Sequence, residues 1–379
     1  MKYINYIYSF FCILIFSLNI SFALPRFSVL NGASCIVCHV NPTGSGLRNS
    51  HGNDVVALEE LPLERWLNKG NEDWDGFITD NIQIGGDFRL QAIQYDNTDS
   101  TRNTSIFPMQ AEIYTYVTLN SYSGIYAKIG IPKKGEDANT EYWALINNLP
   151  NNTWLRLGKS LPNYGLRIDD HTSFIRGGNT NKTLLGLPAN IEGLLFTPYI
   201  YLAPPTIIEL GVPISNALEW TGSISTSLIG SNNKLNNITS QLIYLSTMNE
   251  NIKYMASISY MNENTMSMIG VSGGITYRNL TWTFEIDRAS NWIENYTSIA
   301  FYDEIAWEVI QGLHLIGKYD FFDPKTEIQD GAINRFTFGA EIYPLSILEI
   351  KLQARFNQID MENATKKNPE YLLQTHLYF

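Results

Sequence analysis

From about Ile82 to its last residue, the chain repeatedly alternates apolar and polar side chains with a period of two. Successive side chains of a β-strand point to opposite faces, so each such run predicts a strand with one apolar and one polar face. The pattern recurs at 109–120 and 280–287. It is clearest in residues 348–357, where one face would carry Leu348, Ile350, Leu352, Ala354 and Phe356 and the other Glu349, Lys351, Gln353, Arg355 and Asn357. This repetition restricts most of the chain to an all-β fold.

The runs are about ten residues long and are joined by short turns such as 278–279, which favours a transmembrane β-barrel with lipid outside and a wet lumen inside. A soluble sandwich would show similar alternation in shorter strands. The 22 Tyr, 18 Phe and 8 Trp residues, against only 17% charged residues, also suit a barrel. The final residue, Phe379, shares a face with Tyr371, Leu373 and Leu377. This ending resembles the C-terminal signal of bacterial outer-membrane proteins.

The connections predict which end of the barrel faces which compartment. Long loops at 289–296, 323–331 and 359–368 alternate with short turns, and in such barrels the short turns are periplasmic. About 17 candidate strands can be counted, but single-chain bacterial barrels have an even number. Segment 160–188 either contains a hidden strand or folds inward as a long loop. The sequence predicts an antiparallel barrel of about 16–18 strands in the lipid of the bacterial outer membrane.

A different organisation precedes the alternating region. Lys2, an apolar run and Ser21-Phe22-Ala23 are typical of a secretory signal, here residues 1–23. The remaining chain divides into a small helical and coil segment, 24–80, and the barrel, 81–379. In the first of these, Val55–Asn68 predicts a short helix interrupted by Pro62. The segment is small for a globular domain with its own core, so we expect it to lean on the barrel as a plug.

Cys35-Ile36-Val37-Cys38-His39 forms a C-x-x-C-H motif, the attachment signature of a c-type haem. Two thiols at this spacing lie on one side of a tight helical turn, where each can form a thioether, and the following histidine becomes the proximal iron ligand. Alternatives are a disulfide, a redox dithiol, or a zinc site with His51 as fourth ligand. Export, and Cys12 as the remaining cysteine within the leader, favour one covalently attached haem c.

Other histidines are candidates for further roles. No methionine lies between the leader and Met109, so His51 is the local candidate for a distal iron ligand, against an open position or a ligand from the barrel. His171 follows Asp169 and Asp170, which could form a Fe²⁺ or Mn²⁺ site, although a charged loop is the simpler interpretation. His314 and His376 fall on predicted inward faces.

The chain is acidic, with a net charge of −11, which makes it a poor nucleic-acid binder. Its mixed lumen charges could shape ion flow or hold a plug by salt bridges. These predicted inward charges are Glu112, Glu285, Asp287, Lys318, Asp320, Glu341, Glu349, Lys351 and Arg355. No G-x-S-x-G, H-E-x-x-H or P-loop is present, so hydrolase and nucleotide chemistry have no support.

A leader, one C-x-x-C-H segment and a barrel in one chain resemble the fused monohaem cytochrome–porins, whose characterised members oxidise extracellular Fe²⁺. The resemblance rests on Leu24–Phe27, Cys35–His39 and Gly44–Gly52, while Asn41–Arg48 departs from the iron-oxidising pattern. It implies thioethers at Cys35 and Cys38 and a proximal ligand at His39. The expected function is electron transfer between an extracellular metal ion or redox partner and periplasmic cytochromes, either as a carrier or as an iron oxidase. The alternative is a solute-conducting porin with a periplasmic haem sensor or docking domain.

Overall fold

The computed structural model describes residues 25–69, 74–96, 102–130, 140–168, 173–176, 204–228, 233–328, 331–361 and 364–379. The predicted leader therefore lies outside the described residues, as do His171 and its two neighbouring aspartates. No helix within the described ranges is long and apolar enough to cross a bilayer.

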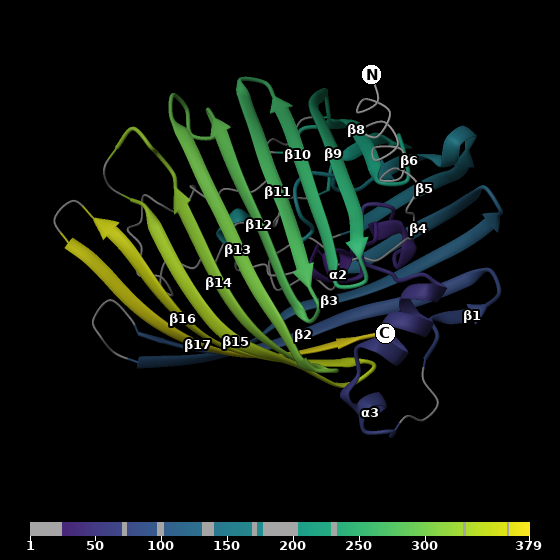
Figure 1. Ribbon diagram of the computed structural model, residues 1–379. Coiled ribbons are helices and arrows are strands. Elements are labelled where there is room, and N and C mark those ends of the chain that lie inside the picture. The colour runs from purple at the N-terminus through teal and green to yellow at the C-terminus, as the bar shows by residue number, and fades with distance from the viewer. Residues whose placement is uncertain are drawn as a thin grey trace, which may run out of the picture.

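Sixteen described strands, β2 to β17, close into one antiparallel barrel (Figure 1). Each strand pairs with its neighbours in sequence, and closure comes from β17 pairing with β2. The strands are β2 (Ile82–Asp96), β3 (Arg102–Asn120), β4 (Ser123–Gly130), β5 (Thr140–Leu149), β6 (Thr153–Lys159), β7 (Thr206–Pro213), β8 (Leu218–Thr226), β9 (Leu235–Asn249), β10 (Ile252–Glu263), β11 (Met266–Tyr277), β12 (Leu280–Ser290), β13 (Thr297–Ile310), β14 (Leu313–Asp323), β15 (Ile333–Leu345), β16 (Leu348–Met361) and β17 (Ala364–Tyr378). A short strand, β1 (Phe77–Thr79), pairs with β2 outside this ring. The predicted barrel and strand number are confirmed.

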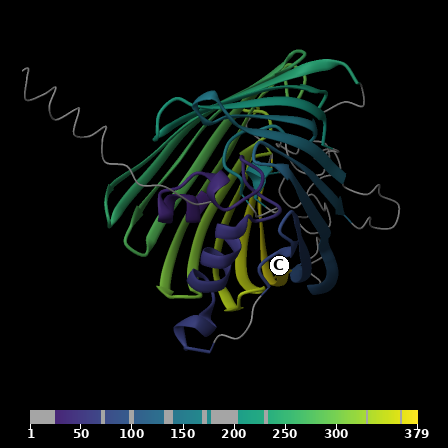
Figure 2. The same cartoon turned by 90° about the vertical axis from the view of Figure 1, so that its right-hand side faces the viewer.

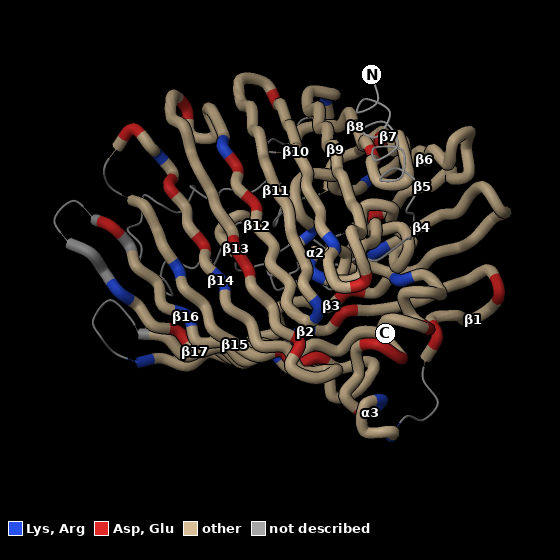
Figure 3. The backbone as a smooth tube through the Cα atoms, in the orientation of Figure 1, with Lys and Arg blue, Asp and Glu red and all other residues tan. Residues whose placement is uncertain are grey.

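The barrel wall has its apolar side chains on the outside and its charged side chains on the inside, the opposite of a soluble protein. On β16, Leu352 and Phe356 are each 46% exposed, whereas Lys351 and Arg355 are buried. Every predicted inward charge is likewise buried. Figure 3 shows acidic and basic residues interspersed along β12 to β16. An exposed apolar wall around a charged interior is stable only where lipid covers the outside, so the protein belongs in the bacterial outer membrane.

The two ends of the barrel differ in their connections. Short turns, including 278–279, 311–312 and 346–347, lie at one end, which is therefore periplasmic. The predicted loop 359–368 is wrong, because β16 and β17 remain paired up to Met361 and Ala364. Polar residues can continue a ladder beyond the bilayer, since their backbone groups still need partners. The C-terminal face is confirmed, with Leu373, Leu377 and Phe379 outward and His376 inward.

The N-terminal segment is helical and irregular. Its elements are α2 (Pro25–Asn31), η1 (Cys35–Val37), η2 (Gly52–Glu60) and α3 (Leu63–Trp66), and the barrel adds η3 (Pro150–Asn152) and η4 (Phe174–Arg176). Pro62 separates η2 from α3, as the sequence predicts. After α2, Gly32 adopts a φ of +75°, and Ala33 N–H donates to the Ser28 carbonyl at 2.8 Å. This glycine cap turns the chain toward the C-x-x-C-H motif.

The lipid-facing assignment predicts a depth-dependent cost for a new charge. Arginine at Leu352 would place a cation in the hydrocarbon, so Leu352→Arg should lower the free energy of unfolding by about 2–4 kcal/mol. Urea unfolding in lipid vesicles, followed by tryptophan fluorescence, measures this. Leu67→Arg is the matched control, because Leu67 is 44% exposed beyond α3; it should change stability by less than about 0.5 kcal/mol. Equal effects of the two substitutions would contradict a lipid-covered wall.

Candidate haem-binding site

The N-terminal segment lies within the periplasmic end of the barrel. Figure 2 looks toward that end and shows the first part of the segment within the ring of strands, and Figure 1 shows α3 beyond its rim. Contacts at the short-turn end hold it there. Lys253 Nζ donates to the Leu30 carbonyl at 2.8 Å, and Gln311 Nε2 donates to the Glu59 carbonyl at 2.6 Å. The segment therefore occupies the periplasmic opening of the lumen.

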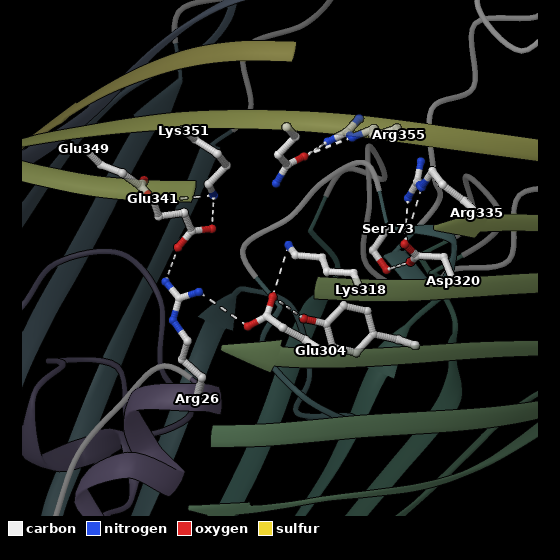
Figure 4. Close-up of polar contacts among 12 residues, drawn as sticks. Arg26, Ser173, Glu304, Lys318, Asp320, Arg335, Glu341, Glu349, Lys351 and Arg355 are labelled. Atoms are coloured by element: carbon white, nitrogen blue, oxygen red, sulfur yellow. Dashed lines mark hydrogen bonds and ion pairs between the residues drawn. The ribbon is translucent and has the colours of Figure 1, made fainter. Parts of the chain in front are cut away.

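Arg26 of α2 forms the main ionic contact between the segment and the wall (Figure 4). Its guanidinium pairs with Glu341 on β15 and lies 3.4 Å from Glu304 on β13. It also donates to Tyr343 Oη at 3.1 Å. Burial acts to lower the pKa of Arg26, but Glu341, Tyr343 and Glu304 outweigh burial and hold the pKa above its usual value. Arg26 therefore stays charged where it docks.

The two carboxylates that hold Arg26 also bind lysines of the wall. Lys318 Nζ lies 3.1 Å from Glu304, and Lys351 Nζ lies 3.2 Å from Glu341. Each buried carboxylate thus sits between a wall cation and the plug cation. Removing Arg26 would leave the lumen charges incompletely balanced, which is costly in a region of low dielectric constant.

The C-x-x-C-H motif forms the tight turn that the sequence predicts. Within and after η1, the N–H groups of Cys38 and His39 donate to the Cys35 carbonyl at 3.2 and 3.0 Å. No disulfide joins Cys35 and Cys38, so the structure differs from that alternative. Burial raises the pKa of the Cys35 thiol to about 11, partly opposed by the nearby positive charge of Arg167.

His39 is oriented by its own loop. Its Nδ1 lies 3.2 Å from the Gly46 carbonyl, so Nδ1 carries the proton and donates it. Nε2 is then the ring nitrogen with the lone pair that a metal requires, and such a hydrogen bond to the other nitrogen is usual for ligating histidines. Two thiols on one turn and a histidine in the correct tautomer fit a covalently attached haem. Cys35 and Cys38 would hold its vinyl carbons and His39 its iron.

The loop after the motif packs against an aromatic part of the wall. Val40 and Leu47 belong to one buried cluster with side chains of β3 to β6, namely Tyr114, Tyr116, Tyr126, Trp143, Leu145 and Trp154. The rings of Tyr126 and Trp143 stack with centroids 4.4 Å apart. Gly46 has a φ of +69°, and a Cβ there would lie 2.6 Å from Tyr126 Oη. At Gly46 this glycine-rich stretch therefore comes into close contact with the barrel wall.

The predicted distal ligand, His51, precedes the helix η2 directly. The chain returns to the motif at this point, since Asn49 N–H donates to the Cys38 carbonyl at 2.9 Å. A Cβ on Gly52 would lie 2.2 Å from the same carbonyl oxygen. The start of η2 therefore packs directly on the motif. Ligation of iron by His51 stays a prediction.

A second segment enters the lumen from the β6–β7 connection at the extracellular end. Asn163 Nδ2 donates to Gln241 Oε1 at 2.7 Å, and Tyr164 Oη donates to Asp287 at 3.0 Å on β12. The described residues 160–168 thus fold inward, one of the two alternatives for 160–188. Figure 4 shows Ser173, which follows in the same connection, beside Asp320 on β14.

The inward segment meets the N-terminal segment at two arginines. Arg156 on β6 is completely buried, pairs with Glu209 and donates to Asn41 Oδ1. Arg167 Nη2 donates to Thr43 Oγ1 at 3.1 Å. Neither arginine was singled out from the sequence, because nothing local distinguishes a buried lumen arginine from a solvated one.

The other two histidines that the structure describes, His314 and His376, contact aromatic or acidic side chains of the protein. His314 is buried edge-on to the rings of Phe27 and Tyr343. His376 lies between Asp87 and Glu349, with nitrogen–oxygen distances of 2.6 and 3.0 Å. Both predicted inward faces are confirmed. Within the described part of the chain, no group of three or more His, Cys, Asp and Glu side chains could hold a metal ion.

Comparisons with known proteins agree with the fold. No protein-family model matches the chain, and no curated protein matches its sequence significantly. Among solved structures, it is similar to an anion-selective porin from Comamonas acidovorans, with a TM-score of 0.55, 9% identity, and coverage of 79% of this chain and 99% of the porin. OprB of Pseudomonas putida gives a TM-score of 0.55, 10% identity, and coverage of 79% and 94%. OmpT of Vibrio cholerae gives a TM-score of 0.53 and 10% identity, and the match covers 80% of this chain and 99% of OmpT.

These similarities, together with the apolar outer wall, define the class: a porin-like barrel of the bacterial outer membrane. At such low identities they show the fold alone. They cover about four-fifths of this chain and nearly the whole of each of these proteins.

Docking through Arg26 predicts a gain of conductance when the contact is lost. Arg26→Met removes the cation shared by Glu304 and Glu341, so the segment should leave the lumen more often. Single-channel recordings in planar bilayers should show a several-fold higher mean conductance than wild type. Arg65→Met is the control, because Arg65 pairs with the exposed Glu59 at 3.8 Å within the segment; it should leave conductance unchanged. An unchanged Arg26→Met channel would show that the segment docks without this contact.

Proposed function

We propose that the protein is an outer-membrane electron carrier that holds one haem c on Cys35, Cys38 and His39. The observation that carries the proposal is the C-x-x-C-H turn, with two cysteines not joined by a disulfide and with His39 held through Nδ1, docked inside a membrane barrel. The bound haem would supply a centre that accepts and releases one electron. The chain's own residues would bind it, fix its axial nitrogen and shield it from lipid.

The filling of the lumen favours electron transfer over solute passage. The N-terminal segment enters from the periplasmic end and the β6–β7 connection from the other, and the two meet at Thr43 and Arg167. Val29, Leu166 and Met255 form one buried cluster across this junction. Two packed segments from opposite ends would hinder a diffusing solute, whereas an electron can pass through packed protein.

The position of the motif indicates from which side each redox partner would exchange electrons with the haem. Its segment contacts the short-turn end, so a periplasmic cytochrome could approach the haem directly. The extracellular partner, a metal ion such as Fe²⁺ or a redox protein, would exchange electrons from the opposite side. Fe²⁺ as the donor would make the protein an iron oxidase, as in the fused cytochrome–porins that it resembles.

Covalent haem is the first testable consequence. Outer-membrane protein expressed with a c-type maturation system should give a haem-stained band at its own mass on a denaturing gel. Cys35→Ala/Cys38→Ala should abolish the band, and His39→Ala should reduce it strongly, because proximal ligation is lost. His51→Ala should keep the band and shift the spectrum to high spin if His51 is the distal ligand.

Ile36→Ala is the matched control for that experiment. Ile36 lies within the same turn and is 39% exposed. This variant should stain like wild type, which separates loss of attachment from damage to the turn. A colourless wild-type protein from a host that matures a known c-type cytochrome would refute the proposal.

A second function, solute conduction with the haem segment as a sensor or docking domain, is favoured by the similar structures, one of which is an anion-selective porin. Measurements on lipid vesicles that contain the protein distinguish electron transfer from solute conduction. A carrier should reduce an entrapped cytochrome c when an external reductant that cannot cross the bilayer is added, and the vesicles should swell slowly in small sugars. Rapid swelling without reduction of the entrapped cytochrome would favour the porin. Cys35→Ala/Cys38→Ala vesicles are the control, since they should lose reduction alone.

A further inference from the structure

Asn49 joins the C-x-x-C-H turn to the helix that follows it. Its side-chain Nδ2 donates to the Ile36 carbonyl at 3.0 Å, between the two cysteines, and its backbone N–H donates to the Cys38 carbonyl at 2.9 Å. Both carbonyls belong to the turn, so one residue contacts the turn at two points. The second contact fixes the peptide group that links Cys38 to His39.

The same asparagine contacts the start of η2. Its Oδ1 accepts the Gly52 N–H at 3.0 Å, and its carbonyl accepts the Asn53 N–H at 3.0 Å. A side-chain oxygen that binds the N–H three positions further on is the contact that a helix-capping asparagine makes. The side-chain amide of Asn49 therefore has two separable contacts, because its oxygen caps the helix and its nitrogen reaches the turn.

The ring of His39 depends on the backbone that Asn49 holds. His39 and Arg48 form an antiparallel bridge, and Asn49 follows Arg48 directly. The loop closed by this bridge supplies the Gly46 carbonyl, which accepts the hydrogen bond from Nδ1 of His39. The position of that carbonyl relative to the ring is therefore set by a short ladder that Asn49 ties to the turn.

Further contacts fix this region on the barrel. Arg48 Nε donates to Asn53 Oδ1 at 2.9 Å, and Asn53 Nδ2 donates to the Asp75 carbonyl, just before β1, at 2.8 Å. The Arg48 guanidinium lies over the ring of Tyr378 on β17, 4.8 Å from its centroid. Asn49 thus connects the turn to residues that are themselves held at the strand on which the barrel closes.

The hydrogen bond at Nδ1 of His39 bears on redox chemistry as well as on orientation. Donation from Nδ1 to a carbonyl makes the other ring nitrogen a stronger electron-pair donor to a metal. Reduction adds one electron to the iron and breaks no bond, so oxidised iron carries one more positive charge and gains more from a stronger donor. A less firmly held His39 would donate less strongly, which favours the reduced state.

We infer that Asn49 is a positioning residue, which holds the C-x-x-C-H turn and His39 in the arrangement that sets the reduction potential of the haem. The inference rests on the proposed function, since it requires that haem. It assigns to the nitrogen of the Asn49 side chain a role that the capping of η2 by its oxygen does not include.

The test is a potentiometric titration of the full-length, haem-loaded protein in detergent, followed in the visible spectrum. Asn49→Ser can still cap η2 but has no group that reaches the Ile36 carbonyl. It should favour reduction about threefold, which for one electron is a rise of about 30 mV. Asn49→Leu removes both contacts and should give a rise at least as large. If Asn49→Leu does not assemble, Asn49→Ser alone decides, because it keeps the cap.

A spectroscopic readout and a control separate positioning from folding. In both Asn49 variants the electron paramagnetic resonance spectrum of the oxidised protein should broaden, because His39 is held less firmly. Ser50→Leu is the matched control, since Ser50 is the next residue and is exposed; it should keep the wild-type potential and spectrum.

Three outcomes would count against these expectations. An unchanged or lowered potential in both Asn49 variants would overturn the inference while haem attachment stands. A rise in Asn49→Leu with none in Asn49→Ser would also overturn it, because the cap alone would then matter. A wild-type protein that takes up no haem would instead refute the proposed function itself.

Discussion

Lipid offers no partner for a backbone N–H or carbonyl group, and this constraint determines the architecture. A sheet can satisfy it only by closing, as β17 does on β2 through nine paired positions from Glu370 to Tyr378. Closure encloses one face of every strand, and that face carries the charges. The same requirement then acts inside the lumen, where Arg335 pairs with Asp320 at 3.1 Å. Because side chains alternate along each strand, a wall that is apolar outside carries its polar and charged side chains inside, where they pair with one another.

The N-terminal segment depends on this interior. The cluster formed mainly by its own residues is small and contains Cys35, Cys38, Val56 and Leu61. Its other buried side chains pack with the barrel, as Phe27 does with Tyr343 and Tyr378. A segment of this length buries too little apolar surface to fold alone. Haem attachment and docking in the barrel would therefore both contribute to its order.

Features with a local cause could be predicted from the sequence. Alternation in 348–357 placed Leu352 outward and Lys351 inward, and Pro62 placed the break between two helices. The loop predicted at 359–368 is wrong because its polar residues continue the β16–β17 ladder to Met361 and Ala364. The C-x-x-C-H motif could be recognised because its chemistry is contained in five consecutive residues.

The contacts that hold the site together could not be predicted in this way. Arg26 and Glu341 are 315 positions apart, and Arg167 and Thr43 are 124 apart. Such pairs are defined only when the barrel closes and its register is fixed. A period-two pattern shows that Glu341 faces the lumen, but not which plug residue it meets. His171 and its two neighbouring aspartates lie outside the described residues, so the choice between a charged loop and a metal site there stays a prediction.

Ionic and apolar contacts play different parts in holding the N-terminal segment inside the barrel. Buried ion pairs contribute little net stability, because desolvation offsets most of their attraction. They do penalise any other arrangement, since a displaced Arg26 would leave Glu304 and Glu341 without their shared cation. The apolar clusters around Phe27, Val29 and Leu47 then supply most of the stability, and the charged residues fix the position of the segment in the barrel. The proposed electron transfer would depend on that position, because it fixes where a haem on Cys35 and Cys38 would face each of its partners.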